Sequence, residues 1–194
     1  MKQFKVVYKE GEIKKGRNLL AFEVAKRNVF NFLKVELECV KNGDAIKILA
    51  LEKTYEETLI HPDLPFPVLI KGNVDRIEER NGIIRIIDYK TGKVDKGNII
   101  LTTWSGLTED SSNDKIIQVL AYAFMYEKLA LEQPMEAGII SFKNLKSGFM
   151  PFTFKVGKEI NTIIDKEMLQ NYLEQIVVLL REILDENIPF EEKV

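Results

Sequence analysis

The stretch GNVDRIEERNGIIRIIDYKTGK, residues 72–93, decides the fold of this chain. Two short apolar runs flank Asn81 and Gly82, and this dipeptide is the strongest short-range signal of a two-residue turn between antiparallel strands. If these two residues form the turn, Arg80 faces Ile83. This first pair then determines which residues face each other along the rest of the two strands. The stretch therefore predicts a β-hairpin of defined register.

This register determines which charged side chains meet. Glu78 lies opposite Arg85, a favourable cross-strand charge pair, and Asp75 lies opposite Asp88. Because side chains alternate between the two faces of a strand, Lys90 shares a face with Asp88. The hairpin thus gathers two carboxylates and one ammonium group on one side of a sheet.

Two interpretations of that face compete. Its charged residues could simply lie on a solvated sheet surface. Its other residues, however, are Ile77, Ile84 and Ile86, so the face points toward a core. Carboxylates there are costly unless something satisfies them, and a bound divalent cation is the usual remedy. The pattern favours a metal-dependent phosphodiesterase site, and a one-residue slip in register would break it.

The residue types suit phosphodiester hydrolysis. A hard cation held by carboxylates makes water nucleophilic at neutral pH and neutralises charge that develops on the phosphorus. A lysine beside the metal adds a positive charge and a hydrogen-bond donor for that water or for a phosphate oxygen. Lys90 could serve as a base only if its pKa were strongly depressed.

Three motifs carry a resemblance to a known family: GxxDRI from residue 72, DYKTGK from residue 88 and QxxxY from residue 118. Their order and spacing resemble the RecB-type branch of the PD-(D/E)XK nuclease superfamily, over residues 70–126. The resemblance implies an α/β fold with a restriction-endonuclease-like core, in which a mixed central sheet with a catalytic β-hairpin is flanked by helices. We expect a single nuclease domain over 1–194, with an N-terminal extension in 1–44 and the core in 45–194.

The resemblance also implies roles for the hairpin residues. Asp75, Asp88 and the main-chain carbonyl of Tyr89 correspond to the ligands of Mg²⁺ or Mn²⁺. Lys90 corresponds to the lysine that orients or activates the attacking water. Asp75, Asp88 and Lys90 are therefore the expected catalytic residues.

Nucleic-acid contacts are expected from two sources. Gln118 and Tyr122 correspond to the family's glutamine–tyrosine motif, although an amphipathic helix could carry the same two residues without any such role. Arg76 and Lys93 are expected to contact the nucleic acid as part of a local basic stripe. Its other candidates are Lys71, Lys96 and Lys115.

The sequence departs from the family pattern at a histidine. RecB-type nucleases usually have a histidine ligand on a helix before the first acidic residue. The only histidine here, His61, precedes a proline in a loop-like stretch, which is more typical of a surface turn. Glu52 is an alternative ligand, although a glutamate at this position is more typical of an exposed strand end.

Cysteine content excludes a second family feature. Some relatives hold an iron–sulphur cluster with four cysteines, but this chain has one cysteine, Cys39. We expect no cluster and no internal disulfide. Cys39 itself is predicted to be a small core residue on a helix.

Composition bounds the partners. The 194 residues are 45% hydrophobic and carry a formal net charge of −2, so the surface is not generally basic. Contact with a single- or double-stranded DNA end must then be local, which would fit delivery of DNA by a helicase subunit or domain. We expect no membrane contact and, from the scarcity of cysteine, a cytoplasmic location.

The remaining elements follow from apolar periodicity. A helix is predicted over 18–40, ended by Gly43, and a strand over 45–59. A short β-like run is predicted at 4–8. The candidates for the buried side of the helix are Leu19, Leu20, Phe22, Val24, Val29, Phe32 and Leu33.

The second half is predicted to hold a long irregular segment, 94–112, and a helix from Ser112 or Asn113 to Glu132. A strand pair, 135–142 and 149–156, and a closing helix, 165–186, follow. Trp104 in the irregular segment could stack on a base or pack the loop onto the core.

The function expected first is a divalent-metal-dependent DNase, with an exonuclease role in recombination or repair. The alternative is a catalytically silent DNA-binding or structural domain of a helicase–nuclease complex. A P-loop NTPase is excluded, because Ile87 and Val94 stand where a P-loop needs glycine and serine or threonine.

Overall fold

The computed structural model describes residues 15–130 and 133–189. The chain divides between Asp44 and Ala45 into two compact units, which are described separately. The β-like run predicted at 4–8 lies outside the described residues. Among the residues that are described, no helix is long and apolar enough to cross a membrane.

The first unit contains helix α2, Gly16–Lys41. Its predicted span and its end are confirmed: Gly43 has φ 103°, and its N–H bonds the carbonyl of Val40 at 3.0 Å. The predicted buried side is wrong, since no α2 residue is buried and Leu20 is 66% exposed. Cys39 is on the helix but only half-buried, so it is not a core residue. Within the described part of its unit, residues 15–44, the helix has no second layer to pack against.

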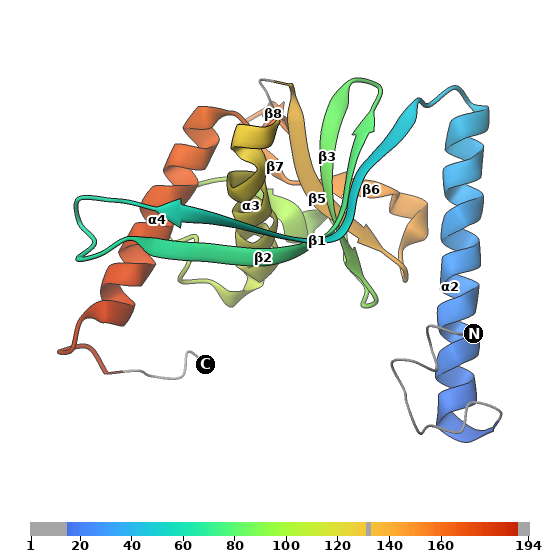
Figure 1. Ribbon diagram of the computed structural model, residues 1–194, viewed down its shortest axis with the longest axis horizontal. Helices are drawn as coiled ribbons and strands as arrows, with labels where there is room; N and C mark the ends of the chain where they lie inside the picture. The colour runs from blue at the N-terminus through green and yellow to red at the C-terminus, as the bar shows by residue number, and fades with distance from the viewer. Residues whose placement is uncertain (1–14, 131–132, 190–194) are drawn as a thin grey trace. The chain divides into compact units, whose positions relative to one another are not determined.

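The second unit is built on a five-stranded mixed sheet in the order β1-β2-β3-β5-β6 (Figure 1). Strand β3 pairs parallel with β5, and the other neighbours are antiparallel. The expected α/β fold, a mixed central sheet flanked by helices, is confirmed. The strands are β1 Ile46–Leu59, β2 Val68–Arg80, β3 Ile83–Lys90, β5 Met135–Ser141 and β6 Phe149–Pro151.

The predicted hairpin register is confirmed. Arg80 pairs with Ile83 across the turn, where Asn81 and Gly82 have φ of 54° and 83°. Positive φ at both central residues is the requirement of the turn type that asparagine and glycine favour. The β2–β3 ladder runs from this turn to Arg76.

Glu78 and Arg85 face each other across the hairpin as predicted, but each forms its ion pairs with other residues. Glu78 is 1% exposed and pairs with Arg76 and Arg80 of its own strand. Arg85 instead bonds Glu136 of β5 at 3.0 Å. Residues two apart on one strand share a face, so the two arginines of β2 reach Glu78 as readily as a residue on β3 does.

Strand β2 is bent at Asp75. Val74 and Ile77 both belong to the hydrophobic core, although residues three apart on a regular strand point to opposite faces. The register places Glu52 of β1 opposite Asp75, and Glu52 has φ 46°. Beyond the bend, the outer parts of β1 and β2 run across a helix, α3 (Figure 1). The bend therefore separates the part of β2 that pairs with β3 from the part that covers α3.

Two helices complete the core. Helix α3, Asp114–Tyr126, buries Ile116 and Leu120, and helix α4, Lys166–Leu184, begins at Asp165, whose carboxylate accepts the N–H of Met168. The closing helix is confirmed. The middle helix ends before the predicted Glu132, because a 3-10 turn over Glu127–Leu129 follows it.

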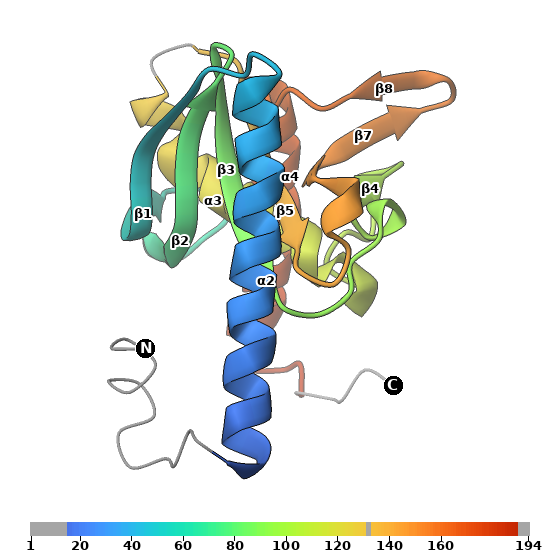
Figure 2. The same cartoon turned by 90° about the vertical axis from the view of Figure 1, so that its right-hand side faces the viewer.

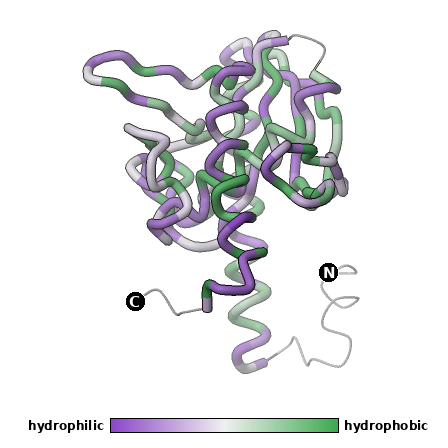
Figure 3. Tube along the Cα trace, turned by 90° about the vertical axis from the view of Figure 1, so that its left-hand side faces the viewer, coloured by the Kyte–Doolittle hydropathy of each residue, from purple (hydrophilic) through white to green (hydrophobic). Residues whose placement is uncertain are grey.

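The predicted strand 149–156 is wrong as a single element. It breaks at Phe152, and its second part, β7 Thr153–Val156, joins β4 Ile100–Leu101 and β8 Glu159–Asn161 in a separate three-stranded sheet. The β7–β8 hairpin projects from the unit and is largely hydrophilic (Figures 2 and 3). The segment 94–112, predicted to be irregular, contains β4 and two short 3-10 turns.

We predict that Gly138→Ala destabilises the sheet. A Cβ atom at Gly138 would clash with the backbone carbonyl of Met150 and lie 2.7 Å from the Cα of Pro151. We expect the free energy of unfolding to fall by about 1–3 kcal/mol in urea titrations. The control is Gly97→Ala, whose Cβ would meet nothing within 4 Å. Equal stability of the two variants would contradict the close β5–β6 packing.

Candidate active site

The two carboxylates of the hairpin meet at the bend of β2. Asp88 at the end of β3 is 4% exposed, and Asp75 is half-buried. The Oδ2 atom of Asp75 accepts the backbone N–H of Tyr89 at 2.7 Å, which fixes the bend against β3. Burial raises the pKa of the Asp88 carboxyl; the negative charge of Asp75 adds to the effect, and Lys90 opposes it.

The backbone of Tyr89 is directed at the same place. The carbonyl of Lys90 accepts the N–H of Phe142, after β5, at 2.9 Å. Successive residues of a strand direct their backbone groups to opposite neighbours. Tyr89 therefore presents its N–H and its carbonyl on the β2 side, where Asp75 lies.

Lys90 connects the hairpin to α3. Its Nζ lies 2.8 Å from Oδ2 of Asp88 and donates to Oε1 of Gln118 at 2.7 Å. The amide of Gln118 in turn donates to the hydroxyl of Tyr122 at 2.8 Å. Gln118 and Tyr122 are four residues apart and thus lie on one face of the helix. The four side chains form a continuous chain of hydrogen bonds and one ion pair.

Tyr122 also explains a glycine of the first motif. A Cβ atom at Gly72 would lie 2.8 Å from a ring carbon of Tyr122 and 3.1 Å from Met125. Glycine lets β2 approach α3 this closely. Burial raises the pKa of the Tyr122 hydroxyl, and the charges of Asp88 and Asp75 act in the same direction. The helix residue thus lies within electrostatic reach of both carboxylates.

A clamp behind Lys90 was not anticipated from the sequence. Ser141 is fully buried; its hydroxyl donates to the carbonyl of Gly92 at 2.8 Å and accepts the N–H of Val94 at 3.3 Å. Asn144 adds a hydrogen bond to the carbonyl of Val94 at 3.0 Å. These bonds fix the chain directly after strand β3. In the sequence, the only indication of this role is that Ser141, a polar residue, ends the apolar run of β5.

Two predicted metal ligands make other hydrogen bonds. The carboxylate of Glu52 accepts a hydrogen bond from Asn73 at 3.1 Å, and Nδ1 of His61 accepts the N–H of Asp63 at 3.2 Å, in a turn. Within the part of the chain that the structure describes, no group of three histidine, cysteine or acidic residues could hold a metal. Among the described residues, neither Glu52 nor His61 is grouped with the carboxylate pair in a set of three such side chains.

Arg76 is not placed to contact a nucleic acid. It is 6% exposed, pairs with Glu78 and donates to the hydroxyl of Tyr89 at 3.2 Å. Alternation along β2 turns it away from the face that carries Ile77. Lys93 is exposed and lies 2.9 Å from Asp95.

Trp104 packs inward. Its ring stacks on Phe154 with centroids 5.0 Å apart and lies 6.1 Å from Phe152. Of the two interpretations offered by the sequence, this position matches a loop packed onto the core. Phe154 thus covers one face of the Trp104 ring.

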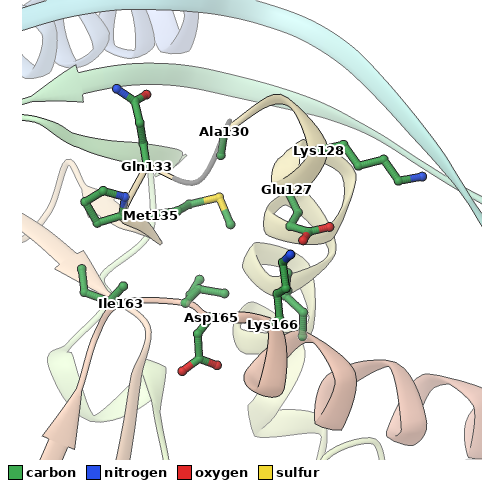
Figure 4. A pocket seen from close by; sticks show the side chains of 11 residues that line it. Glu127, Lys128, Ala130, Gln133, Met135, Ile163, Asp165 and Lys166 are labelled. Atoms are coloured by element: carbon green, nitrogen blue, oxygen red, sulfur yellow. The ribbon is translucent and has the colours of Figure 1, made fainter.

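One pocket lies at the far end of β5, where Met135 and Ala130 lie near Lys128, Asp165 and Lys166 (Figure 4). Parallel pairing aligns Met135 with Ile84 and Ser141 with Lys90. Six residues of strand span about 20 Å. This pocket is therefore remote from the carboxylate pair.

The oxygen-rich donor set fits a hard divalent cation. Two carboxylates and a main-chain carbonyl are the ligand types that Mg²⁺ and Mn²⁺ prefer. The raised pKa of Asp88 shows that its charge is not fully compensated by Lys90. A cation held by Asp75 and Asp88 would compensate it.

Comparison with known proteins identifies the family. The family model of the PD-(D/E)XK nuclease superfamily matches residues 11–194, and the chain belongs to this superfamily. Among curated proteins, no match is found. The chain is similar to a crystal structure of SSO0001 at 15% identity, covering 92% of this chain and 68% of that one with a TM-score of 0.31.

The raised pKa of Asp88 predicts a pH-dependent stability. Between the ordinary carboxyl pKa of about 3.9 and the raised value, the folded protein binds more protons than the unfolded one, so the free energy of unfolding falls as pH rises. Asp88→Asn should therefore raise the free energy of unfolding of the metal-free protein at pH 7, with a smaller gain under acid conditions.

Urea titrations in EDTA over a pH series measure this difference. The control is Asp63→Asn, at an exposed aspartate 3.6 Å from Arg181. A loss of stability in Asp88→Asn at neutral pH would show that the ion pair with Lys90 outweighs the cost of burial.

Proposed function

We propose that this member of the PD-(D/E)XK nuclease superfamily is a divalent-metal-dependent DNase that hydrolyses phosphodiester bonds. The single observation that carries the proposal is the convergence of Asp75, Asp88, Lys90 and Gln118 from two strands and a helix. Packing alone does not require a buried aspartate at this point of the sheet.

Asp75, Asp88 and the carbonyl of Tyr89 would hold Mg²⁺ or Mn²⁺. The bound cation would lower the pKa of a coordinated water and offset the negative charge that develops on the phosphate. The hydrogen bond from the N–H of Tyr89 fixes one oxygen of Asp75 and leaves the other for a ligand role. Asp88 supplies a buried carboxylate whose charge the cation would neutralise.

Lys90 would act as a donor to the attacking water or to a phosphate oxygen. Its Nζ is held between Asp88 and Gln118, both within 2.8 Å. The hydroxyl of Tyr122 fixes the amide of Gln118, so Gln118 is oriented to accept from Lys90. We assign Gln118 and Tyr122 as positioning residues, which can contact the nucleic-acid backbone as well.

The finer assignment is a RecB-type exonuclease acting in recombination or repair, in the cytoplasm, with a helicase subunit or domain as partner. This assignment is supported by the spacing of the three motifs and by the pairing of surface lysines with nearby carboxylates. Lys71 and Lys115 each lie within 3.6 Å of a carboxylate, as Lys93 does. Weak affinity for DNA would favour a partner that delivers the strand. The family match spans both units, so we treat 1–194 as one nuclease domain.

A second candidate is a catalytically silent domain that binds or clamps DNA. The observation that favours it is the absence, among the described residues, of a third acidic or histidine ligand at the carboxylate pair. A domain of this kind would bind DNA without cleaving it. The same cleavage assay separates the two candidates.

We predict Mg²⁺- or Mn²⁺-dependent cleavage of labelled single- or double-stranded DNA by the wild-type chain. Asp75→Ala and Asp88→Ala should each reduce it to the level seen in EDTA, because the ligand set would lose a carboxylate. Asp63→Ala, at an exposed aspartate, is the matched control and should cleave normally. Cleavage that survives in both site variants would place the activity elsewhere, and no cleavage by any folded protein would favour the silent domain.

We predict that Gln118→Ala lowers kcat by about 10–100-fold, because Lys90 loses the acceptor that positions it. Gln118→Glu keeps an acceptor for Lys90 and should lose less. Tyr122→Phe removes only the hydroxyl that orients the amide and should have an intermediate effect. Steady-state kinetics on a short strand separate the roles: a rise in KM with normal kcat would make Gln118 a nucleic-acid contact only.

A further inference from the structure

A pocket of about 370 Å³ lies in the segment that connects Lys90 to α3. Its size falls within the range of small-molecule sites. Most of its polar lining is uncharged hydroxyl and amide: Asn98, Thr102, Thr103, Ser105, Ser112 and Asn113. Ile100, Leu101 and Ile116 supply apolar surface.

The charge of this pocket excludes a phosphate group as its ligand. Among the described residues that line it, Asp110 alone is ionisable and no basic side chain is present. Hydrogen bonds from Ser112 lower the pKa of the Asp110 carboxyl, so it is charged at neutral pH. A negative charge repels phosphate, whereas hydroxyls, amides and apolar surface suit the edges and faces of a nucleobase.

The pocket is close to the candidate active site along α3. Asn113, in the wall of the pocket, precedes Gln118 by five residues. At 1.5 Å per helical residue, this separation is about 7.5 Å along the axis. At 3.4 Å or more per nucleotide, one or two nucleotides cover that span. Val94, near the other end of the segment, is fixed by Ser141 and Asn144.

We propose that this pocket binds an unpaired nucleobase of the substrate strand, one or two nucleotides from the scissile phosphate. The inference rests on the proposed nuclease function and adds a preference for single-stranded or frayed nucleic acid. A paired base could not enter, because its hydrogen-bonding edge is already occupied.

Gly97 offers a substitution that fills the pocket. It lines the cavity, lies outside the left-handed region of φ, and a Cβ atom there would meet nothing within 4 Å. Gly97→Phe adds a bulky ring at the wall of the pocket, whereas Gly97→Ala adds only a methyl group at the same position. Thr102→Phe fills it from another lining residue and serves if Gly97→Phe does not fold.

The experiment measures binding in EDTA, where metal-dependent cleavage is absent. The probes are fluorescent twelve-nucleotide strands of thymidine, of uridine, and of abasic tetrahydrofuran units with the same phosphates. We expect the wild type and Gly97→Ala to bind the thymidine strand about tenfold more tightly than the abasic strand. We expect the filled variants to bind both equally; the uridine strand reports whether RNA shares the site.

Two results would overturn the proposal. The wild type could bind the thymidine and abasic strands equally, or a filled variant could still bind the thymidine strand more tightly. Cleavage in Mg²⁺ by the same proteins separates this failure from that of the proposed function. Cleavage without base preference leaves the nuclease and removes the base pocket. Base preference lost on filling, without cleavage by the wild type, supports the pocket and counts against the nuclease.

Discussion

The hydrogen bond between Nζ of Lys90 and Oε1 of Gln118 is the interaction on which the candidate site depends. It joins the end of the β2–β3 hairpin to α3, and the ion pair to Asp88 extends it to the carboxylates. A helix at this distance requires a strand without a side chain beneath Tyr122, which Gly72 provides. The bend at Asp75 then lets one strand pair with β3 and cover α3 at once.

Electrostatic balance gives the same cluster its chemical character. Asp88 is buried beside a second carboxylate, and Nζ of Lys90 lies 2.8 Å from its Oδ2 atom. The raised pKa of Asp88 reflects burial that this lysine does not fully offset. A divalent cation bound at these carboxylates would offset this charge, and Lys90 would then be available to a water molecule or a phosphate oxygen. If the cluster had only a structural role, nothing would offset the free-energy cost of burying the Asp88 carboxylate.

Local rules predicted the hairpin and part of its chemistry. Asn81 and Gly82 fix the turn, and alternation then determines the faces of Asp88 and Lys90, because both rules act over a few residues. The same alternation turns Arg76 to the opposite face, where it is buried, so its charge alone does not indicate a contact with nucleic acid. The partner of Arg85 was also missed, because Glu136 comes from a strand far along the chain.

What the sequence could not predict depends on long-range packing. The clamp of Ser141 on Gly92 requires the parallel pairing of β3 with β5, and the break at Phe152 follows from the separate sheet that β7 joins. The burial of α2 was wrongly predicted, since periodicity identifies an apolar surface without identifying what covers it. Contacts between side chains of elements far apart in the chain cannot be predicted from the local sequence of either element.

The central claim is that Asp75 and Asp88 hold a divalent cation together with the carbonyl of Tyr89. The most direct measurement is anomalous X-ray diffraction from crystals of the wild-type chain grown or soaked in Mn²⁺. We predict a manganese peak between the two carboxylates, within about 2.0–2.3 Å of their oxygens. A fully soaked crystal with manganese at other carboxylates and none between Asp75 and Asp88 would contradict the account.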